Sequence, residues 1–406
     1  MTRWDAVVVG AGPAGSATAR LLAQAGARVL LLDRAQFPRD KPCSEYLSPQ
    51  STRVLEHLGP DLVRAVEAAA PAQLYGMKLV APSGRVAVGR FAADHGWQPP
   101  RPYGFALPRP VFDTILRDAA VRAGVESRED STVEELVYDA GAVGGVVVRT
   151  AAGSRETIKA RVVIGADGLN SVVARRLGVR TEHAPRRVAY TAHIADVEGV
   201  GDAGEMHVGR SGYVGLGPVG GGLTTVALVL PLAAVRADGR DPRRDFFAEL
   251  ERFAGLAGRF DPRRLVRRVL VTGPFARWSR RTTADGALLV GDAADFFDPF
   301  TGQGIYAALR GAELAAEVLI PTLAADGPVT AAALAPYRRA RRRAFLGKWT
   351  LERLIGLGVG WPALAERVIE RLARHPALAD LLVGATGNFV PARAALRPGV
   401  LARLLF

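Results

Sequence analysis

Cysteine and long apolar runs are what this sequence most clearly lacks. Cys43 is the single cysteine among 406 residues. One cysteine excludes an intrachain disulfide and a cysteine-based metal site, and we predict no bound metal. No apolar run reaches the ~18 residues that span a bilayer. The first strand begins about five residues after Met1, which leaves no room for a signal peptide. We therefore expect a cytoplasmic protein.

Lysine is also scarce, since only four of the 53 basic residues are Lys. The formal net charge of +13 raises the question of a nucleic-acid partner. Arginine is spread along the whole chain, however, without a basic arm or aromatic–basic alternation, so we expect no nucleic-acid binding. The densest cluster is Arg338–Arg343, with apolar residues beyond it. A solvated helix face is its commoner explanation, and a basic amphipathic patch for anionic lipid is the alternative.

What the chain does contain is enough apolar surface for sizeable cores. Apolar residues make up 49% of it, which excludes a mainly disordered protein. A length of 406 residues is long for one compact core and favours two domains, or one domain with a large insertion.

Residues 5–34 form the most informative segment. A run of β-formers leads into Gly10-Ala11-Gly12-Pro13-Ala14-Gly15, an Ala/Leu-rich helical stretch follows, and a second apolar strand ends at Asp33-Arg34. In such a unit the three glycines permit a tight turn, a close approach to a pyrophosphate and close helix–strand packing. The helix N-terminus attracts phosphate, and a carboxylate at Asp33 accepts hydrogen bonds from a ribose. The segment therefore predicts a dinucleotide site.

Two later segments specify the dinucleotide as FAD. An apolar strand leads into Gly165-Ala166-Asp167-Gly168, and another leads into Gly291-Asp292 and then Asp298–Ile305. A carboxylate at Asp292 is placed for a ribityl hydroxyl, and glycines at 302 and 304 let backbone N–H groups approach a flavin. The helix that begins there stabilises negative charge on a reduced flavin.

The order of these elements predicts a discontinuous cofactor domain. Strand-rich stretches are expected around 73–88 and 188–275, a helix at 242–257, a helix from Gly304 to Leu319, and a largely helical region after 334. The predicted FAD domain comprises residues 1–70, 107–180 and 276–335. A β-sheet substrate domain comprises residues 71–106 and 181–275, and a helical C-terminal region comprises residues 336–406.

These motifs resemble those of the glutathione-reductase-type flavoproteins of the p-hydroxybenzoate hydroxylase lineage over residues 3–335. Asp40-Lys41-Pro42-Cys43 and Asp298–Ile305 are most similar to the geranylgeranyl reductase branch. The resemblance implies an α/β fold: a Rossmann-like FAD domain with an inserted mixed or antiparallel substrate sheet. Asp33 where Glu is common, Ser44 where Gly is usual, and Gln303 where Glu is frequent are departures from the pattern.

The resemblance also implies which residues contact the cofactor. Arg109 matches the arginine at the diphosphate, Asp167 and Gly168 match the middle motif, and Cys43 matches a residue over the flavin. The complete predicted cofactor set is Gly10, Gly12, Pro13, Ala14, Gly15, Asp33, Arg34, Cys43, Arg109, Asp167, Gly168, Gly291, Asp292, Pro299, Gly302, Gln303, Gly304 and Ile305.

Catalytic residues are less well defined, and the candidates are Cys43, Tyr213 and His193. Cys43 is equally compatible with a small buried hydrophobe, and a histidine in a sheet is more often structural. Gly215–Gly220 also fits Gly-x-Gly-x-x-Gly, but no helix follows it, so we interpret it as a hairpin of the substrate sheet. Lys78 is similar by rough position to the lysine of flavin halogenases, but the Trp-x-Trp-x-Ile-Pro segment of those enzymes is missing.

Three hypotheses about function remain open. In the first two, NAD(P)H reduces FAD. The flavin then either hydroxylates a hydrophobic aromatic, polyketide or phenolic-lipid substrate, or reduces isoprenoid or quinone double bonds. The resemblance to the wider lineage favours the monooxygenase narrowly. The third is a membrane-surface electron carrier. The C-terminal region is compatible with a lid, a dimer face or a peripheral membrane contact.

Overall fold

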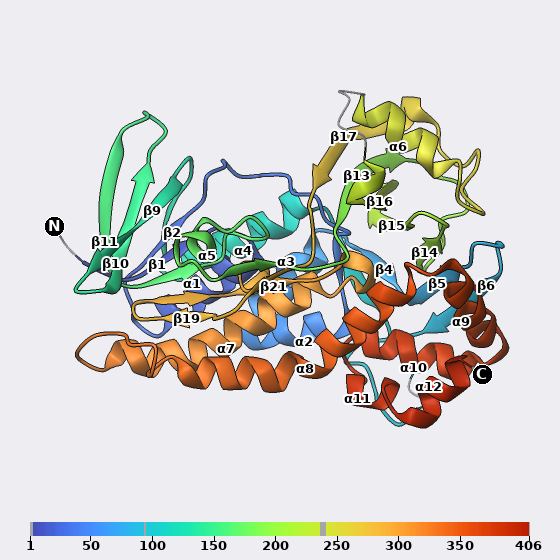
Figure 1. Ribbon diagram of the computed structural model, residues 1–406. Helices are drawn as coiled ribbons and strands as arrows, with labels where there is room; N and C mark the ends of the chain where they lie inside the picture. The colour runs from blue at the N-terminus through green and yellow to red at the C-terminus, as the bar shows by residue number, and fades with distance from the viewer. Residues whose placement is uncertain (1–2, 93–94, 236–240, 406) are drawn as a thin grey trace.

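A mostly parallel sheet forms one half of the molecule (Figure 1). The computed structural model describes residues 3–92, 95–235 and 241–405. The strand order is β19-β20-β11-β1-β2-β8, and the antiparallel pair β9–β10 extends from β11. The strands are β1 (Trp4–Val9), β2 (Val29–Leu32), β8 (Glu126–Arg128), β9 (Thr132–Asp139), β10 (Ala142–Arg149), β11 (Arg155–Gly165), β19 (Thr283–Ala284) and β20 (Ala287–Leu289).

Both faces of this sheet are covered, as expected for parallel strands that read as continuous apolar runs. Alternate residues of β1 enter two separate cores: Ala6 and Val8 pack on one face, and Val7 and Val9 on the other. The flanking helices are α1 (Pro13–Gln24), α2 (Pro49–Leu58), α3 (Pro60–Ala68), α4 (Arg109–Arg122), α5 (Val172–Arg176) and α7 (Gly304–Ala324).

A second, seven-stranded sheet forms the other half, in the order β17-β13-β16-β15-β14-β5-β6. Every neighbouring pair is antiparallel except β14–β5. Its outer face packs on α6 (Pro242–Leu250) and the turns that follow. The strands are β5 (Gly76–Val80), β6 (Val86–Arg90), β13 (Arg187–Ala195), β14 (Gly204–Val208), β15 (Tyr213–Gly220), β16 (Leu223–Pro231) and β17 (Leu265–Thr272).

The C-terminal helices pack against the inner face of this second sheet, and α9 and α10 contact β6 (Figure 1). They are α8 (Ala335–Gly358), α9 (Pro362–Arg374), α10 (Pro376–Thr386), α11 (Ala392–Ala395) and α12 (Pro398–Leu405). Two small sheets join the halves: β3 (Tyr46–Leu47), β7 (Gly104–Ala106) and β4 (Ala72–Leu74), and β12 (Arg180–Glu182), β18 (Arg277–Ser279) and β21 (Asp295–Phe296). Short 3₁₀ turns are η1 (Leu232–Ala234), η2 (Pro262–Arg264), η3 (Gly291–Ala293) and η4 (Pro299–Thr301).

This arrangement confirms the predicted fold class. The Gly215–Gly220 segment belongs to a hairpin of the second sheet, as predicted: it lies in β15, which pairs antiparallel with β16, and the turn falls at Gly221 and Gly222. The prediction of a helix over 242–257 is corrected, because the helix ends at Leu250 and the chain continues as turns. Helix α3 was not predicted from the sequence.

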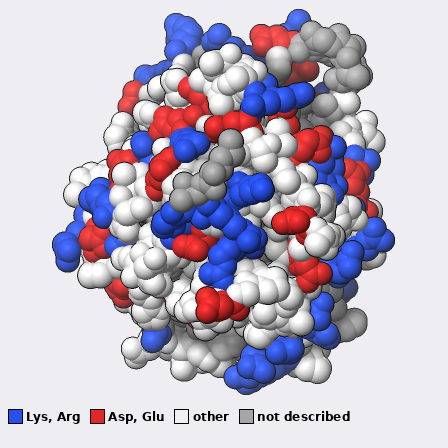
Figure 2. Space-filling view, turned by 90° about the vertical axis from the view of Figure 1, so that its left-hand side faces the viewer, with Lys and Arg blue, Asp and Glu red and all other residues white. Residues whose placement is uncertain are grey.

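Charged side chains of both signs are interspersed on the face that carries the β9–β10 end of the molecule (Figure 2). No uninterrupted basic stripe crosses that face, which agrees with arginine being scattered along the sequence. Among the described residues, no helix is long and apolar enough to cross a membrane.

Candidate functional site: a dinucleotide cradle and an apolar cavity

The β1–α1 turn uses each of its three glycines for a different reason. Gly10 has φ of +99°, and a Cβ there would lie 2.6 Å from the carbonyl oxygen of Ala166. A Cβ on Gly15 would lie 1.8 Å from the carbonyl oxygen of Gly10, so only glycine lets α1 pack this close to β1. Gly12 is the N-cap of α1 and offers no side-chain cap, which leaves the first N–H groups of the helix free for a ligand.

Two guanidinium groups flank that helix N-terminus. A Cβ on Gly12 would lie 3.4 Å from Nη2 of Arg39 and 3.9 Å from Nη2 of Arg109. Arg109 is buried and pairs with Asp113 at 2.7 Å, and Arg39 reaches the same carboxylate at 3.2 Å. Positive charge, free N–H groups and space for an approaching ligand meet at one point, so the residues present fit a dinucleotide diphosphate.

Asp33 follows β2 and lies close to the same turn. Its carboxylate accepts hydrogen bonds from the N–H groups of Ala11, at 2.8 Å, and Ala35, at 3.0 Å. Arg39 lies 3.3 Å from it. Arg34 is exposed and contacts none of these groups. The carboxylate therefore shapes the turn, and its remaining lone pairs are available to a ribose.

Beyond the cradle lies a cavity of about 600 Å³ between the two sheets and the C-terminal helices. Part of its wall comes from the dinucleotide-binding half. Of the sequence-predicted residues, those that line it are Gly12, Pro13, Ala14, Cys43, Arg109, Gly168, Tyr213, Gly291, Asp292, Pro299, Gly302, Gln303, Gly304 and Ile305. The residues predicted from sequence that do not line it are Gly10, Gly15, Asp33, Arg34, Asp167 and His193.

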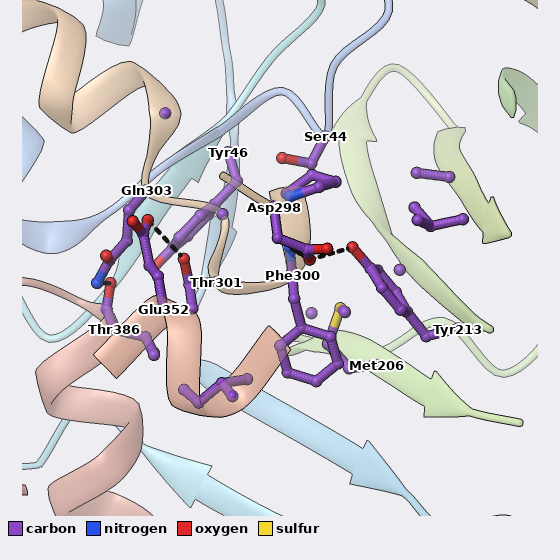
Figure 3. A pocket seen from close by; sticks show the side chains of 18 of the residues that line it. Ser44, Tyr46, Met206, Tyr213, Asp298, Phe300, Thr301, Gln303, Glu352 and Thr386 are labelled. Carbon is purple, nitrogen blue, oxygen red and sulfur yellow. Dashed lines mark hydrogen bonds between the residues drawn. The ribbon is translucent and has the colours of Figure 1, made fainter. Parts of the chain in front are cut away.

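The Asp292 and Pro299–Ile305 segments form one side of this cavity. Gly302 has φ of +64° and ends a 3₁₀ turn, after which α7 begins at Gly304. The start of α7 thus points its free N–H groups toward the cavity lining. The Gln303 side chain donates from its amide to the carbonyls of Ala385 and Thr386 at 3.1 Å each, and so joins the start of α7 to the end of α10 (Figure 3).

Asp167 and Gly168 separate in the structure. The Asp167 carboxylate accepts hydrogen bonds from the N–H groups of Val172 and Val173 and from the hydroxyl of Ser171, and so caps α5. Burial raises the pKa of its carboxyl group, and these hydrogen bonds oppose the rise. Gly168 lines the cavity, and a Cβ on this residue would lie 3.3 Å from Nζ of Lys41.

A buried trio that sequence analysis did not assemble lies in the cavity wall. The hydroxyl of Tyr213 donates to Oδ1 of Asp298 at 2.6 Å (Figure 3). Arg187 donates to Oδ2 of the same carboxylate at 2.6 Å. Burial, together with the Asp298 charge, raises the pKa of Tyr213 well above its ordinary value. Tyr213 therefore stays a neutral phenol, and its ring packs edge-on against Phe300.

Cys43 and His193 belong to a different contact. Cys43 lines the cavity and accepts a hydrogen bond from the N–H of Glu45 at 3.3 Å. Glu45 is fully buried, and its carboxylate lies 2.6 Å from Nε2 of His193 and 3.3 Å from Nη1 of Arg267. The two sheet residues thus hold the Cys43 loop in place, and His193 does not line the cavity.

Some of the residues that the sequence analysis did not identify lie in or beside a recognised motif, and others do not. Asp298 stands inside the quoted Asp298–Ile305 motif, and Arg39 directly precedes Asp40-Lys41-Pro42-Cys43. Arg187 and Glu45 carry no local signal, because their partners lie more than a hundred residues away.

A glycine-shaped cradle for a dinucleotide diphosphate that opens into an apolar cavity defines an FAD-dependent oxidoreductase. Consistent with this, the model of the FAD binding domain family matches residues 3–346, and the chain belongs to that family.

Its curated relatives include reductases. The chain is 31% identical over 353 residues to the digeranylgeranylglycerophospholipid reductase of Methanothrix thermoacetophila, covering 85% of this chain and 84% of the relative. It is 32% identical over 336 residues to the menaquinone reductase of Mycolicibacterium smegmatis, covering 78% and 76%.

Solved structures with the same architecture span nearly the whole chain. A flavoprotein/dehydrogenase from Cytophaga hutchinsonii matches with a TM-score of 0.85 and 21% identity, covering 98% of this chain and 96% of that one. A geranylgeranyl bacteriochlorophyll reductase-like protein from Thermoplasma acidophilum has a TM-score of 0.80 at 20% identity, covering 100% and 99%. A flavin-dependent brominase has a TM-score of 0.79 at 20% identity, covering 99% of each chain. Identities this low establish the fold alone.

Proposed function

We propose that this protein is an FAD-dependent reductase that saturates carbon–carbon double bonds of a long, apolar, isoprenoid-like substrate, with NAD(P)H as the reductant. The observation that carries the proposal is the cavity. It runs from the Pro299–Ile305 segment to the C-terminal helices, so a chain-like substrate would extend from the flavin into an apolar compartment. Its wall there includes Leu351, Ile355, Leu364, Val368, Leu372 and Leu404.

The relatives support the same proposal. Reductases of lipid and quinone substrates are named among the proteins that this chain matches at about 30% identity over most of its length. Since fold likeness does not define chemistry, the cavity and these names carry the argument together.

Saturating a double bond requires one hydride and one proton. FAD, when bound, supplies the hydride transfer from NAD(P)H to the acceptor carbon. The apolar walls exclude water from the bond. Tyr213 holds its proton at Oη, where Asp298 fixes the O–H direction and Arg187 balances the charge of that carboxylate. The phenol is protonated at neutral pH, as an ordinary tyrosine also is, and this proton would pass to the second carbon once the hydrogen bond to Asp298 is released.

Halogenation, which some structural neighbours perform, has less support here. Lys78, the residue similar by position to the halogenase lysine, pairs with Glu205 at 3.4 Å and does not line the cavity. Aromatic hydroxylation stays the second candidate, because the same fold and cofactor serve it.

Reoxidation of the reduced flavoprotein distinguishes the two reactions. The holoenzyme is reduced anaerobically with dithionite and mixed in a stopped-flow spectrometer with aerated buffer, or with a polyprenyl quinone or another isoprenoid acceptor. The proposal expects slow reoxidation by oxygen and rapid reoxidation by the isoprenoid acceptor. A transient C4a-(hydro)peroxide absorbance, or reoxidation that phenols accelerate, would instead establish an oxygenase.

A further inference from the structure

The outer face of α8 is divided into a basic half and an apolar half. Its exposed residues, apart from Ala344, follow helical spacing and share one face. In the first half of the helix this face carries Arg338, Arg339, Arg342 and Arg343. None of the four forms an ion pair with a described residue. Figure 1 shows α8 along the lower edge of the molecule, with α7 on its inner side.

The second half of the same face carries three exposed leucines beside Thr350 and Arg353, where a surface helix is normally polar throughout. The exposed fractions are 51% for Leu346, 47% for Leu354 and 54% for Leu357. Trp361, in the turn that follows, is 69% exposed, the largest fraction among the large apolar residues described. A tryptophan flanked by leucines and arginines is a composition typical of a membrane interface.

This apolar surface is continuous with the cavity. Leu354 is exposed and also lines the cavity. Leu405 of α12, which is 38% exposed, lines it as well. The mouth of the cavity therefore opens beside the apolar half of α8.

The C-terminal helical region carries a strong excess of positive charge. Residues 336–406 contain thirteen Lys and Arg against four Asp and Glu, so this part carries +9 of the chain's net charge of +13. A second copy of the chain docked on this face would place arginine against arginine, which disfavours self-association. A partner with both anionic groups and apolar surface would complement the basic half and the apolar half of the outer face of α8.

We propose that α8 and Trp361 dock the protein on an anionic lipid bilayer, with the cavity mouth turned toward the lipid. Arg338, Arg339, Arg342 and Arg343 contact the phosphate headgroups. Leu346, Leu357 and Trp361 enter the boundary between headgroups and acyl chains. An apolar substrate then passes from the bilayer past Leu354 into the cavity without crossing water. The binding itself does not depend on which reaction the flavin performs.

The test uses the full-length, FAD-loaded protein and vesicle co-sedimentation. Vesicles of phosphatidylcholine with phosphatidylglycerol are compared with phosphatidylcholine alone, at low and high salt. The proposal expects binding to the anionic vesicles that weakens as salt rises, because the Debye length shortens. Failure to bind either vesicle, or equal binding to both, would overturn it.

Matched variants locate the contact. Arg342→Gln with Arg343→Gln is expected to weaken binding to anionic vesicles roughly thirtyfold at low salt, from about one kilocalorie per arginine. Leu357→Glu and Trp361→Glu should each weaken it at least as much as one arginine. The controls are Val266→Glu and Arg268→Gln on β17, where Val266 is 61% exposed.

Flavin absorbance reports that each variant is folded and loaded. Controls that weaken binding as much as the α8 variants would overturn the assignment of this face. So would a concentration-dependent dimer that the α8 variants abolish, because the face would then bind a second copy.

Discussion

At the scale of single residues, the site depends on buried charges with completed partners. The buried Asp298 carboxylate accepts hydrogen bonds from Tyr213, Arg187 and the N–H of Phe300, so its charge is balanced within the protein. Arg109 and Arg39 share Asp113 and still face the turn at Gly12. Because each group is fixed by a neighbour, single substitutions here have specific and separable effects.

Tyr213→Phe removes the proton that the proposed reaction needs and leaves the ring in place. We expect kcat with an isoprenoid acceptor to fall roughly a hundredfold or more, with KM nearly unchanged. Steady-state kinetics with flavin absorbance measures both. Phe300→Leu is the control, since it disturbs the same packing without removing a donor. An equal loss of kcat in both variants would contradict a role for the phenol.

Arg39→Met removes one of the two cations beside Gly12 and spares the Arg109–Asp113 pair. Loss of a charge-assisted hydrogen bond predicts FAD affinity reduced roughly tenfold to a hundredfold. Titration of the apoprotein with FAD, followed by fluorescence quenching, gives the value. Arg34→Met, on the same loop but exposed, should bind FAD normally. Equal losses would mean that the net charge of the loop matters rather than the cradle.

At the scale of elements, close approaches and shared ion pairs fix the geometry. Helix α1 lies against β1 because Gly15 has no side chain. Strands β14 and β5 are tied by Glu205 and Lys78, and Arg259 and His207 complete the cluster.

Gly15→Ala forces α1 away from β1 and should lower the free energy of unfolding by about 3 kcal/mol, with loss of FAD. Gly26→Ala, at φ of +89° with open space around it, should cost about 1 kcal/mol and keep FAD. Urea unfolding of both variants measures the difference. Similar costs, with FAD retained in both variants, would show that α1 accommodates the added Cβ and that the close approach to β1 does not require glycine.

Glu205 makes stability depend on acid. Burial by itself raises the pKa of this carboxyl group, but hydrogen bonds from Arg259 and His207 and nearby charges outweigh it and hold the pKa well below its ordinary value. The unfolded chain then binds a proton before the folded one does as pH falls. The stabilisation is therefore fully present above about pH 5 and declines progressively below it, toward the lowered pKa of the folded state.

Glu205→Gln should cost about 2 kcal/mol at pH 7, since Arg259 and Lys78 are left without a carboxylate. The difference from the unsubstituted protein should remain near pH 5 and shrink as pH falls below about 4. Urea unfolding at several pH values tests this, and a difference independent of pH would contradict it.

At the scale of the whole molecule, the cavity exists because three parts of the chain meet. The dinucleotide-binding half supplies the floor, the second sheet one wall, and α8–α12 the apolar wall. The buried Glu45 joins the first two parts through His193 and Arg267. In the proposed reaction, the C-terminal helices and not the flavin segments would therefore limit the length of the substrate.

Val368→Phe narrows the apolar end without touching those segments. Overpacking of about 1–3 kcal/mol predicts a KM for long-chain acceptors raised roughly tenfold, while a short-chain quinone and the FAD content stay unaffected. Val266→Phe, on the outside of β17, is the matched control. Equal effects on short and long acceptors would exclude this region as the tail site.

The sequence by itself determined the fold class and the cofactor. The reason is that Gly10, Gly12, Gly15 and the Asp292 segment act within a few residues, where turn geometry and strand–helix order are local. It also indicated Arg109, by resemblance, as a contact of the cofactor diphosphate, and the structure places Arg109 on the lining of the cavity.

Only the tertiary structure decided which distant side chains meet. Tyr213 and Asp298 are 85 positions apart, and Glu45 and His193 are 148 apart. Such pairs depend on how two sheets face each other, which no local pattern encodes. The same holds for the outer face of α8: the sequence shows the arginines, but which leucines stay uncovered beside the cavity depends on the packing of every other helix.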